Sequence, residues 1–411
     1  MITLLQGKQI LLGVCGSIAA YKVADLASKL TQAGATVHVV MTESAQKFVT
    51  PLTFEALTGH SVYTDLWQTN AALPVHIAHV ALGESSDLIV IAPATANMIA
   101  KLAHGLADDL LSVTVLAARC PVVLVPAMDG AMYEHPATQA NVNLLRERGV
   151  IIVEPEVGRF ASGLEGRGRL PETPKLLGAI RRVLAQQGIL AGRKVVVTAG
   201  GTREALDPVR FISNHSSGKQ GYAIAQAALD AGAEVTLIST VEHLPVPIGA
   251  TLLPVNSAAE MRDAVLAQVD CDALIMAAAV ADFRPATMAE QKIKKENAAT
   301  TIQLAKNDDI IALVGAQRHE TNCPRVLVGF AAETENLLDN AQAKLERKNA
   351  DMIVANNLTQ PGAGFATDTN IVTLITRHHP PEPIDLASKT QIAELIIERV
   401  ALALAARSEQ T

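Results

Sequence analysis

The sequence predicts an α/β protein made of two doubly wound, Rossmann-like domains. Its 411 residues exceed what one ordinary hydrophobic core organises. Hydrophobic residues make up 49% of the chain and aromatic residues only 3%, a balance that suits buried parallel strands of valine, isoleucine and leucine. The same succession of strand, small-residue turn, helix and strand occurs twice, at residues 8–42 and 193–240. Because such a unit implies parallel pairing, we expect two sheets, each with a ligand crevice at its carboxyl edge.

The two copies have the same order of elements and the same residue type at the end of the helix. The first runs through the strand KQILLGV, the turn CGSIAA, a helix ending in QAGA and the strand TVHVVMT. The second runs through RKVVVTA, a Gly-Gly turn with a longer insertion, a helix ending in DAGA and the strand EVTLIST. In each copy a glycine terminates the helix just before the next strand, as expected of a helix C-terminus.

Further strands are predicted at DLIVIAP, PVVLVPA, VIIVEP, ALIMAAA, RVLVGFA and MIVAN. The C-terminal segment TQIAELIIERVALALAA has helical periodicity and is expected to pack on the second sheet. Residues 287–300 are polar and charged, which indicates a loop. A helix TPKLLGAIRRVLAQQ precedes Gly188 and the second opening strand. The boundary is therefore placed so that the domains are 1–191 and 192–411.

Composition limits the classes of partner and the cellular setting that we expect for this protein. The formal net charge of -7 argues against a nucleic-acid footprint. No apolar run approaches the roughly 20 residues of a membrane helix, so no membrane partner is expected. The four cysteines lie far apart without metal-ligand spacing, and they fit a reducing, cytoplasmic setting.

The turn after the first strand contains Gly16, Ser17 and Ile18 and leads directly into a helix. Small residues there let backbone N–H groups approach a phosphate at the helix N-terminus. The turn is not GxGxxG, so the usual dinucleotide fingerprint is absent. Many α/β turns are rich in glycine for steric reasons alone, so the turn by itself leaves both interpretations open.

Three further segments strengthen the phosphate interpretation: APATAN at 92–97, GLADDLLS at 105–112 and PAMD at 126–129. Together with GSIAAYK, they resemble the flavin-containing cysteine decarboxylases, whose fold is flavodoxin-like. The resemblance implies FMN as cofactor and a trimer-based oligomer with active sites between subunits. The FMN-binding residues that it implies are Gly16, Ser17, Ile18, Thr42, Pro93, Thr95, Asn97 and Asp109.

The same resemblance chooses between two neighbouring histidines. His79 stands in H-V-A-L-G, which matches the H-[IV]-x-L-G context of the family's active-site histidine, whereas His76 does not. A lone histidine is more often an ordinary surface or partly buried residue, and His76 keeps that interpretation. We expect His79 to be catalytic, as a proton-transfer group.

Two positions depart from the family pattern. Met128 and Asp129 are the implied substrate-binding residues, but the family has asparagine where this chain has Asp129. An ionised aspartate cannot donate, so it must bind substrate through a proton, a water or a shifted contact. The flap SGLEGRGR at 162–169 begins with Ser162 where related enzymes have a cysteine that assists reduction of the enethiol intermediate. We take Ser162 as the catalytic residue at this position. Either Ser162 or water delivers the proton, or another residue takes the role.

The second domain opens on a polar turn that is not a P-loop, because Gln220 follows Lys219 where Walker A requires serine or threonine. SNHSSGK, AAVADFRP, KIKK and GFAAET resemble phosphopantothenate–cysteine ligase, of the bacterial type fused behind the decarboxylase. The two resemblances cover nearly the whole chain, in the family's order. They imply CTP with Mg²⁺ and a dimer of ligase domains. Residue chemistry alone leaves CTP and ATP open, since base selectivity depends on backbone placement.

The implied reaction joins 4'-phosphopantothenate to cysteine through an acyl-cytidylate, after which the first domain decarboxylates 4'-phosphopantothenoylcysteine to 4'-phosphopantetheine. Asn214 is implied to contact the acyl intermediate, Arg210 to bind substrate beside it, and Lys292 to follow the phosphate charge on a closing loop. The implied nucleotide-binding residues are Gly201, Thr202, Asp282, Lys292, Asn307, Asp308, Asp309, Ile310, Phe330, Lys344 and Lys348, with Asp282 also as a Mg²⁺ ligand.

Plainer interpretations compete with several of these assignments. Lys292–Lys295 is also typical of a solvated charge run, and Lys344 and Lys348 of an exposed helix face. A nicotinamide dehydrogenase is disfavoured by the missing GxGxxG turns, and a regulatory flavoprotein subunit would need no intact ligase half. A ligase with a decarboxylase-like scaffold is the remaining alternative, and it rests on Asp129 and Ser162. The expected assembly is decarboxylase trimers linked by ligase dimers, up to a dodecamer.

Overall fold

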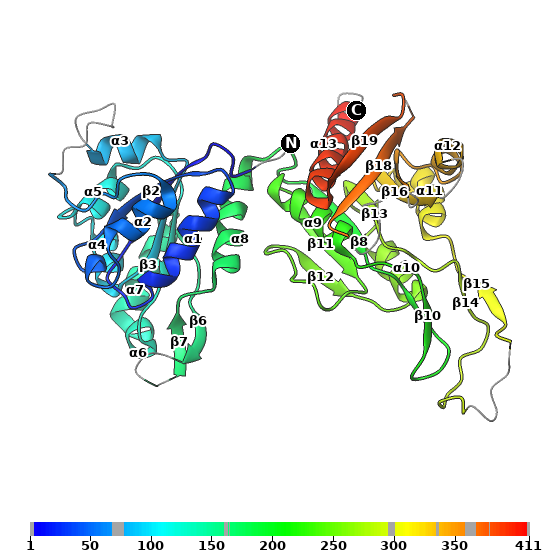
Figure 1. The fold of residues 1–411 in the computed structure, drawn as a ribbon, viewed down its shortest axis with the longest axis horizontal. Coiled ribbons are helices and arrows are strands. Elements are labelled where there is room, and N and C mark those ends of the chain that lie inside the picture. Colours follow the sequence, from blue (N-terminus) through cyan, green and yellow to red (C-terminus); the bar gives the residue numbers. More distant parts are fainter. Residues whose placement is uncertain are drawn as a thin grey trace. The chain divides into compact units, whose positions relative to one another are not determined.

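The computed structural model describes residues 4–67, 78–159, 163, 165–294, 301–333, 337–357, 367–377 and 379–408. The chain divides into two compact units, and the boundary along the chain falls between Leu184 and Ala185 (Figure 1). Each unit contains its own sheet and its own core. None of the helices within these ranges is long and apolar enough to cross a membrane.

The N-terminal unit is built on five parallel strands in the order β2-β1-β3-β4-β5. This is the flavodoxin-like order, whose direction reverses between β1 and β3. The strands are β1 (Gln9–Val14), β2 (Thr36–Met41), β3 (Leu88–Ala94), β4 (Val122–Pro126) and β5 (Ile151–Ile152). All five predicted strands of this half are confirmed, although β5 is much shorter than VIIVEP.

Helices cover both faces of this sheet. The helices are α1 (Ala20–Gln32), α2 (Pro51–Thr58), α3 (Ala78–Ser85), α4 (Ala96–His104), α5 (Leu110–Ala117), α6 (Gly130–Glu134), α7 (Pro136–Glu147) and α8 (Thr173–Leu184). Leucines and valines of α1 and α8 share one buried cluster with β1 and β2, while α4, α5 and α7 contribute to the cluster on the other face. The predicted flap is an antiparallel hairpin of β6 (Glu156–Arg159) and β7 (Glu165–Arg169).

The C-terminal unit contains an eight-stranded sheet in the order β12-β11-β8-β13-β16-β17-β18-β19. The first six strands are parallel and follow the 3-2-1-4-5-6 order of a Rossmann sheet, whose switch point lies between β8 and β13. The strands are β8 (Lys194–Ala199), β11 (Glu234–Ser239), β12 (Thr251–Pro254), β13 (Ala273–Met276), β16 (Val326–Glu333), β17 (Met352–Asn357), β18 (Thr369–Thr376) and β19 (Glu382–Ser388). Strands β18 and β19 are antiparallel additions that were not predicted.

The two faces of this sheet carry different helices. The helices α9 (Lys219–Asp230) and α13 (Lys389–Ser408) pack on one face, which confirms the predicted C-terminal helix. The other face is covered by α10 (Ala258–Ala267), α11 (Ile310–Thr321) and α12 (Leu337–Arg347). Two small hairpins, β9 (Arg203–Ala205) with β10 (Phe211–Ser213) and β14 (Phe283–Pro285) with β15 (Leu304–Lys306), stand outside the main sheet.

Residues 185–191 belong to the C-terminal unit, whereas the sequence placed the domain boundary after Ala191. Leu190 is buried in the C-terminal core, and its backbone N–H donates to the Ala231 carbonyl at 2.7 Å. A Cβ at Gly188 would meet that carbonyl oxygen at 2.2 Å, so the segment runs tightly against the end of α9. Helix-stop residues mark where a helix ends but carry no signal for the core that the following segment joins.

Candidate active sites

The turn after β1 lies at the switch point of the N-terminal sheet, where a ligand crevice is expected. Ser17 shapes the turn, since its N–H donates to the Cys15 carbonyl at 2.9 Å and its hydroxyl accepts from the Ala19 N–H at 3.3 Å. A Cβ at Gly16 would stand 2.4 Å from the Ser44 Cβ, so only glycine fits there. The start of α1 has no side-chain cap, although the Ala20 and Lys22 N–H groups already donate to the Ser17 and Ala19 carbonyls. Burial raises the pKa of the Cys15 thiol to about 12, so Cys15 is no nucleophile.

Other predicted flavin-binding residues lie in or just after the neighbouring strands. They differ in how far they are buried and in the hydrogen bonds that they already make. Thr42 follows β2 directly, and its N–H donates to the Val14 carbonyl at 3.0 Å. Thr95 caps α4 by accepting from the Met98 N–H at 3.3 Å, with Asn97 exposed on the first turn. Pro93 is buried in β3, where its carbonyl accepts from the Cys15 N–H.

Asp109 has structural partners of its own. Its carboxylate accepts from the Ser112 N–H at 2.8 Å as the cap of α5, and it pairs with the Lys101 ammonium at 2.7 Å. Both oxygens therefore hold α5 and α4 together. The placement of Asp109 near the flavin turn stays a prediction.

His79 is the second residue of α3 and is half-buried. Leu82 and Gly83 of the same motif explain the position of His79, because Leu82 is buried and Gly83 lies against α5. A Cβ at Gly83 would stand 3.1 Å from the Thr114 carbonyl oxygen. The motif therefore fixes a helix–helix contact that sets the position of His79. His76 lies outside the described residues.

The Met128-Asp129 segment is tied to the flap. The Met128 N–H donates to the Gly168 carbonyl of β7 at 3.0 Å. Asp129 caps α6 by accepting from the Ala131 N–H at 3.1 Å, a role that aspartate and asparagine fill equally well. Ser162 lies outside the described residues.

A charged network holds α6 and the flap in place. The Tyr133 hydroxyl donates to Glu154 at 2.6 Å, and that carboxylate also pairs with Arg167 of β7 at 2.8 Å. The Arg167 guanidinium lies 5.6 Å from the Tyr133 ring centroid. Burial and the Glu154 contact raise the pKa of the Tyr133 phenol to about 12, so Tyr133 stays a hydrogen-bond donor at neutral pH.

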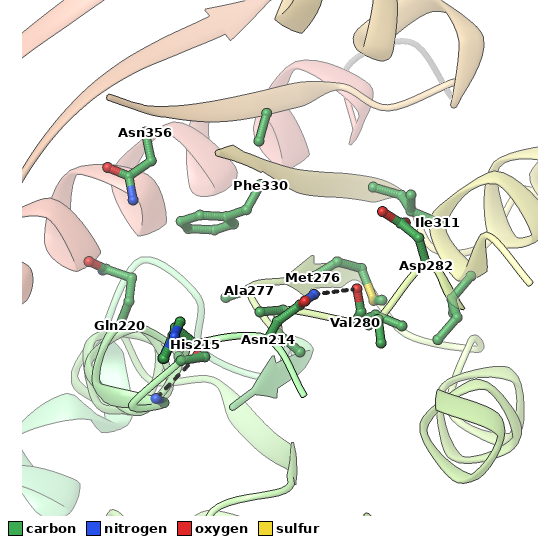
Figure 2. Close-up of a pocket in the computed structure, with 18 of the residues that line it drawn as sticks. Asn214, His215, Gln220, Met276, Ala277, Val280, Asp282, Ile311, Phe330 and Asn356 are labelled. Carbon is green, nitrogen blue, oxygen red and sulfur yellow. Dashed lines mark hydrogen bonds between the residues drawn. The ribbon is translucent and has the colours of Figure 1, made fainter. Parts of the chain in front are cut away.

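The C-terminal unit contains a cavity of about 490 Å³ at the carboxyl edge of its sheet, beside the β8/β13 switch point (Figure 2). Eight of the predicted ligase residues line it: Asn214, Asp282, Asp308, Asp309, Ile310, Phe330, Lys344 and Lys348. The start of α9, at Gly218–Gly221, forms another part of its wall. The volume falls in the range of small-molecule sites.

Three other predicted nucleotide residues support the wall of the cavity without lining it. The Thr202 hydroxyl accepts from the Ala281 N–H at 2.9 Å, and the Asn307 side chain donates to the Ala281 carbonyl at 2.8 Å. Gly201 lies so close to the Asn214 carbonyl oxygen that a Cβ there would approach it to 2.6 Å. These residues hold the segment that ends in Asp282.

Two of the acidic residues that line this cavity form ion pairs. Lys348 pairs with Asp309 at 3.2 Å, and Arg262 pairs with Asp308 at 2.6 Å. Asp282 is exposed, and its carbonyl accepts from the Asn307 N–H at 2.8 Å. Among the described residues no three acidic, histidine or cysteine side chains gather in a way that could hold a metal ion by themselves.

Arg210 is outside the cavity lining and anchors the loop of Lys292. The buried Asp207 carboxylate accepts from the Arg210 guanidinium and, at 3.1 Å, from the Ile293 N–H. Arg210 also donates to the Ile293 carbonyl at 2.9 Å. The loop is thereby tied down at the residue beside Lys292, which is itself exposed.

Replacing Asp207 with asparagine should loosen this loop. Arg210 would lose its ion pair and the Ile293 N–H its charged acceptor, so we expect the KM for the nucleotide to rise several-fold in the ligation. The Arg210 contact holds the pKa of Asp207 below its ordinary value near 3.8. The anchor is therefore complete above about pH 4 and is lost only as pH falls through the lower folded value. Ligation assays at neutral pH check the first effect, and an unchanged KM would contradict it.

Several residues of the cavity were not among the predicted ones, notably Gln220, Asn356, Asn370 and Lys389. Lys389 is the first residue of α13 and is buried. Burial, with help from the nearby Lys219, lowers the pKa of its ammonium. Asn370 and Lys389 escaped prediction because β18 and β19, which bring them to the cavity, were themselves not predicted.

Two family models divide the chain between them. Residues 3–185 match the family described as "Flavoprotein", and residues 190–403 match the "DNA/pantothenate metabolism flavoprotein C-terminal domain". Together with the flavodoxin-like and Rossmann-like sheets, they define a two-domain flavoprotein of pantothenate metabolism.

Full-length relatives narrow the class. The chain is 46% identical over 412 residues to the coenzyme A biosynthesis bifunctional protein CoaBC of Bacillus subtilis, covering 99% of each chain. It is 45% identical over 399 residues to the Vibrio cholerae protein of the same name, covering 96% of this chain and 98% of that one. The chain belongs to this family of coenzyme A biosynthesis bifunctional proteins. A crystal structure of the C-terminal domain of such a protein is 37% identical and covers 53% of this chain and 99% of that one, with a TM-score of 0.45.

Proposed function

We propose that this protein joins cysteine to 4'-phosphopantothenate and then decarboxylates the product to 4'-phosphopantetheine. The observation that carries the ligase step is the cavity at the β8/β13 switch point, which collects Asn214, paired acidic residues and Lys344 and Lys348 in one place. The flavin turn, His79 and the flap occupy the other unit. The residues proposed for the two reactions therefore lie in different units of the chain.

The ligation proceeds in two balanced steps. The carboxylate of phosphopantothenate attacks the α-phosphate of CTP, so an acyl-oxygen–phosphorus bond forms and pyrophosphate leaves. The amine of cysteine then attacks the acyl carbon, a carbon–nitrogen bond forms, CMP leaves with the electron pair of the broken bond, and one proton is released. Lysine ammonium groups stabilise the charge that develops on the phosphates. CTP is proposed as the nucleotide on the family resemblance.

Mg²⁺ would accompany the nucleotide. Carboxylate oxygens suit this ion, which is commonly held by one or two carboxylates together with substrate phosphates. Asp282 is exposed on the cavity wall and provides such a ligand. Asp308 and Asp309 stand on the same wall, each already beside a cation.

FMN is the proposed cofactor of the N-terminal unit. The Gly16-Ser17-Ile18 turn suits a phosphate, because it is only partly buried, has no room for a side chain at Gly16 and precedes a helix without a side-chain cap. Bound FMN would supply the redox chemistry of the decarboxylation. His79 would move the proton, and Met128 and Asp129 would position the substrate beside the flap.

The proposed assembly is decarboxylase trimers linked by ligase dimers. Large apolar side chains exposed on the N-terminal unit support an interface there, among them Ile18 and Tyr21 beside the flavin turn, at 59% and 61% exposure. Clustered apolar exposure of this kind is typical of surfaces that other subunits cover. The four cysteines are free thiols, which fits a reducing cytoplasm.

The purified protein should be yellow and should convert phosphopantothenate, cysteine, CTP and Mg²⁺ to phosphopantetheine, CMP and pyrophosphate. Mass analysis of the product tests both halves at once. Accumulated phosphopantothenoylcysteine would mean that the N-terminal unit is a scaffold only. Accumulated unsaturated enethiol would mean that Ser162 does not support the second half of the decarboxylation.

A further inference from the structure

The ligase cavity has two walls of different chemistry. On one face of the sheet the wall consists of Asp308 and Asp309, just before α11, Lys344 of α12, and Lys348, just after α12. The opposite wall lies on the face that carries α9 and α13. The predicted nucleotide residue Phe330 packs against this face, whereas the polar groups of this wall have no predicted role. Asn356 belongs to this second wall, because it follows Met352 and Val354 at alternate positions of β17, and both pack in the α9/α13 core.

Two carboxamides on the second wall have unused acceptors. The oxygens Oε1 of Gln220 and Oδ1 of Asn356 are buried and accept no hydrogen bond from the described part of the chain. Asn356 is only 9% exposed. Gln220 is held in place, since its Nε2 donates to the Lys389 carbonyl at 3.1 Å. Figure 2 shows the two carboxamides turned toward one another beside the Phe330 ring. A buried acceptor without a donor is unfavourable, so these oxygens suit a ligand with N–H groups.

Two lysines, Lys219 and Lys389, line the cavity beside these oxygens. Lys389 is buried next to them, with its ammonium donating to the Thr367 carbonyl, and Lys219 pairs with the exposed Asp368 at 2.6 Å. The N-terminus of α9 adds a positive helix dipole at Gly218. This wall therefore combines uncharged N–H acceptors with an environment that favours an anion.

We propose that the second wall is the cysteine subsite of the ligase, in which Gln220 and Asn356 accept the amine N–H groups and Lys389 binds the carboxylate. The proposal rests on the proposed ligation. An amine must be uncharged to attack an acyl carbon, and acceptors without charge next to cations disfavour an ammonium ion. An uncharged primary amine has two N–H groups and one lone pair. When each acceptor takes one N–H, the lone pair points away from both acceptors and can attack the acyl carbon. The cavity that holds these groups also contains Asn214 and the nucleotide residues, so the amine and the acyl carbon can meet.

The variants Gln220→Met and Asn356→Leu remove one acceptor each with little change of shape. We expect each to raise the KM for cysteine about three- to tenfold, the loss of one hydrogen bond. The first half-reaction needs no cysteine, so phosphopantothenate-dependent exchange of labelled pyrophosphate into CTP should keep its wild-type rate. Gln226→Met, on the same helix outside the cavity lining, is the matched control.

A second arm tests the carboxylate contact. Cysteamine is cysteine without its carboxylate, and Lys389→Met should reduce the preference of the enzyme for cysteine over cysteamine. A role of Lys389 in holding α13 alone would lower both rates and leave their ratio unchanged. The proposal is overturned if the acceptor variants slow pyrophosphate exchange or raise the KM for phosphopantothenate while the KM for cysteine stays the same. A wild-type protein without any ligation would instead refute the proposed function itself.

Discussion

Replacing Lys292 with alanine is expected to lower kcat for ligation by about 10²–10³-fold, the size of effect typical of losing one group that stabilises transition-state charge. Lys292 is exposed on a loop whose next residue, Ile293, is bound to Asp207 and Arg210. The tether leaves the lysine side chain free to move while fixing the base of the loop. Closure on the triphosphate would then bring the ammonium group to the charge as it develops.

The neighbouring Lys294→Ala provides the matched control, because Lys294 is exposed on the same loop two residues further on. A solvated charge run would make both substitutions equally mild, whereas a specific role makes only Lys292 costly. Pyrophosphate release with all substrates saturating gives kcat directly. The decarboxylation of supplied phosphopantothenoylcysteine, measured on the same preparation, shows whether the rest of the protein is intact. Equal effects of the two substitutions would contradict the assignment of Lys292.

Replacing His79 with asparagine is expected to lower decarboxylation by about 10²–10⁴-fold, the contribution typical of a proton-transfer group. Asparagine keeps a polar side chain of similar size but cannot exchange a proton near neutral pH. The packing of α3 on α5 through Leu82 and Gly83 does not involve the imidazole, so the helix should remain in place. Loss of activity would then report chemistry rather than folding.

Two readouts separate the chemical role of His79 from a structural one. The flavin absorbance of the purified variant should equal that of the wild-type protein, because the predicted phosphate turn is built from other residues. Ligation, carried by the other unit, should proceed at the wild-type rate and yield phosphopantothenoylcysteine as the end product. Retained phosphopantetheine formation would rule out His79 as the proton-transfer residue and return attention to the residues of the flap.

Most of the main sheet strands could be predicted from local patterns, although β12 and the order of the strands in each sheet were not. Buried strands such as β3 and β16 are continuous apolar runs, and glycines at the ends of α1 and α9 mark where the chain turns back to the sheet. Long motifs such as SNHSSGK and APATAN identified the family, which the full-length relatives confirm. Strands β18 and β19 escaped prediction because they are antiparallel, partly exposed and rich in polar residues, so they lack the apolar run of a central strand.

Local sequence pattern determined the two doubly wound sheets, the small-residue turn between the first strand and its helix, and the family to which the chain belongs. Tertiary structure alone decided which residues share a cavity. Gln220, Asn356, Asn370 and Lys389 are separated by up to 169 positions in the chain, yet they meet because α9, β17, β18 and α13 converge at one edge of one sheet. Tertiary structure also decided that Arg210 anchors a loop and that Asp109 caps a helix. Side-chain partnerships of this kind depend on distances across the fold, which spacing along the chain does not encode.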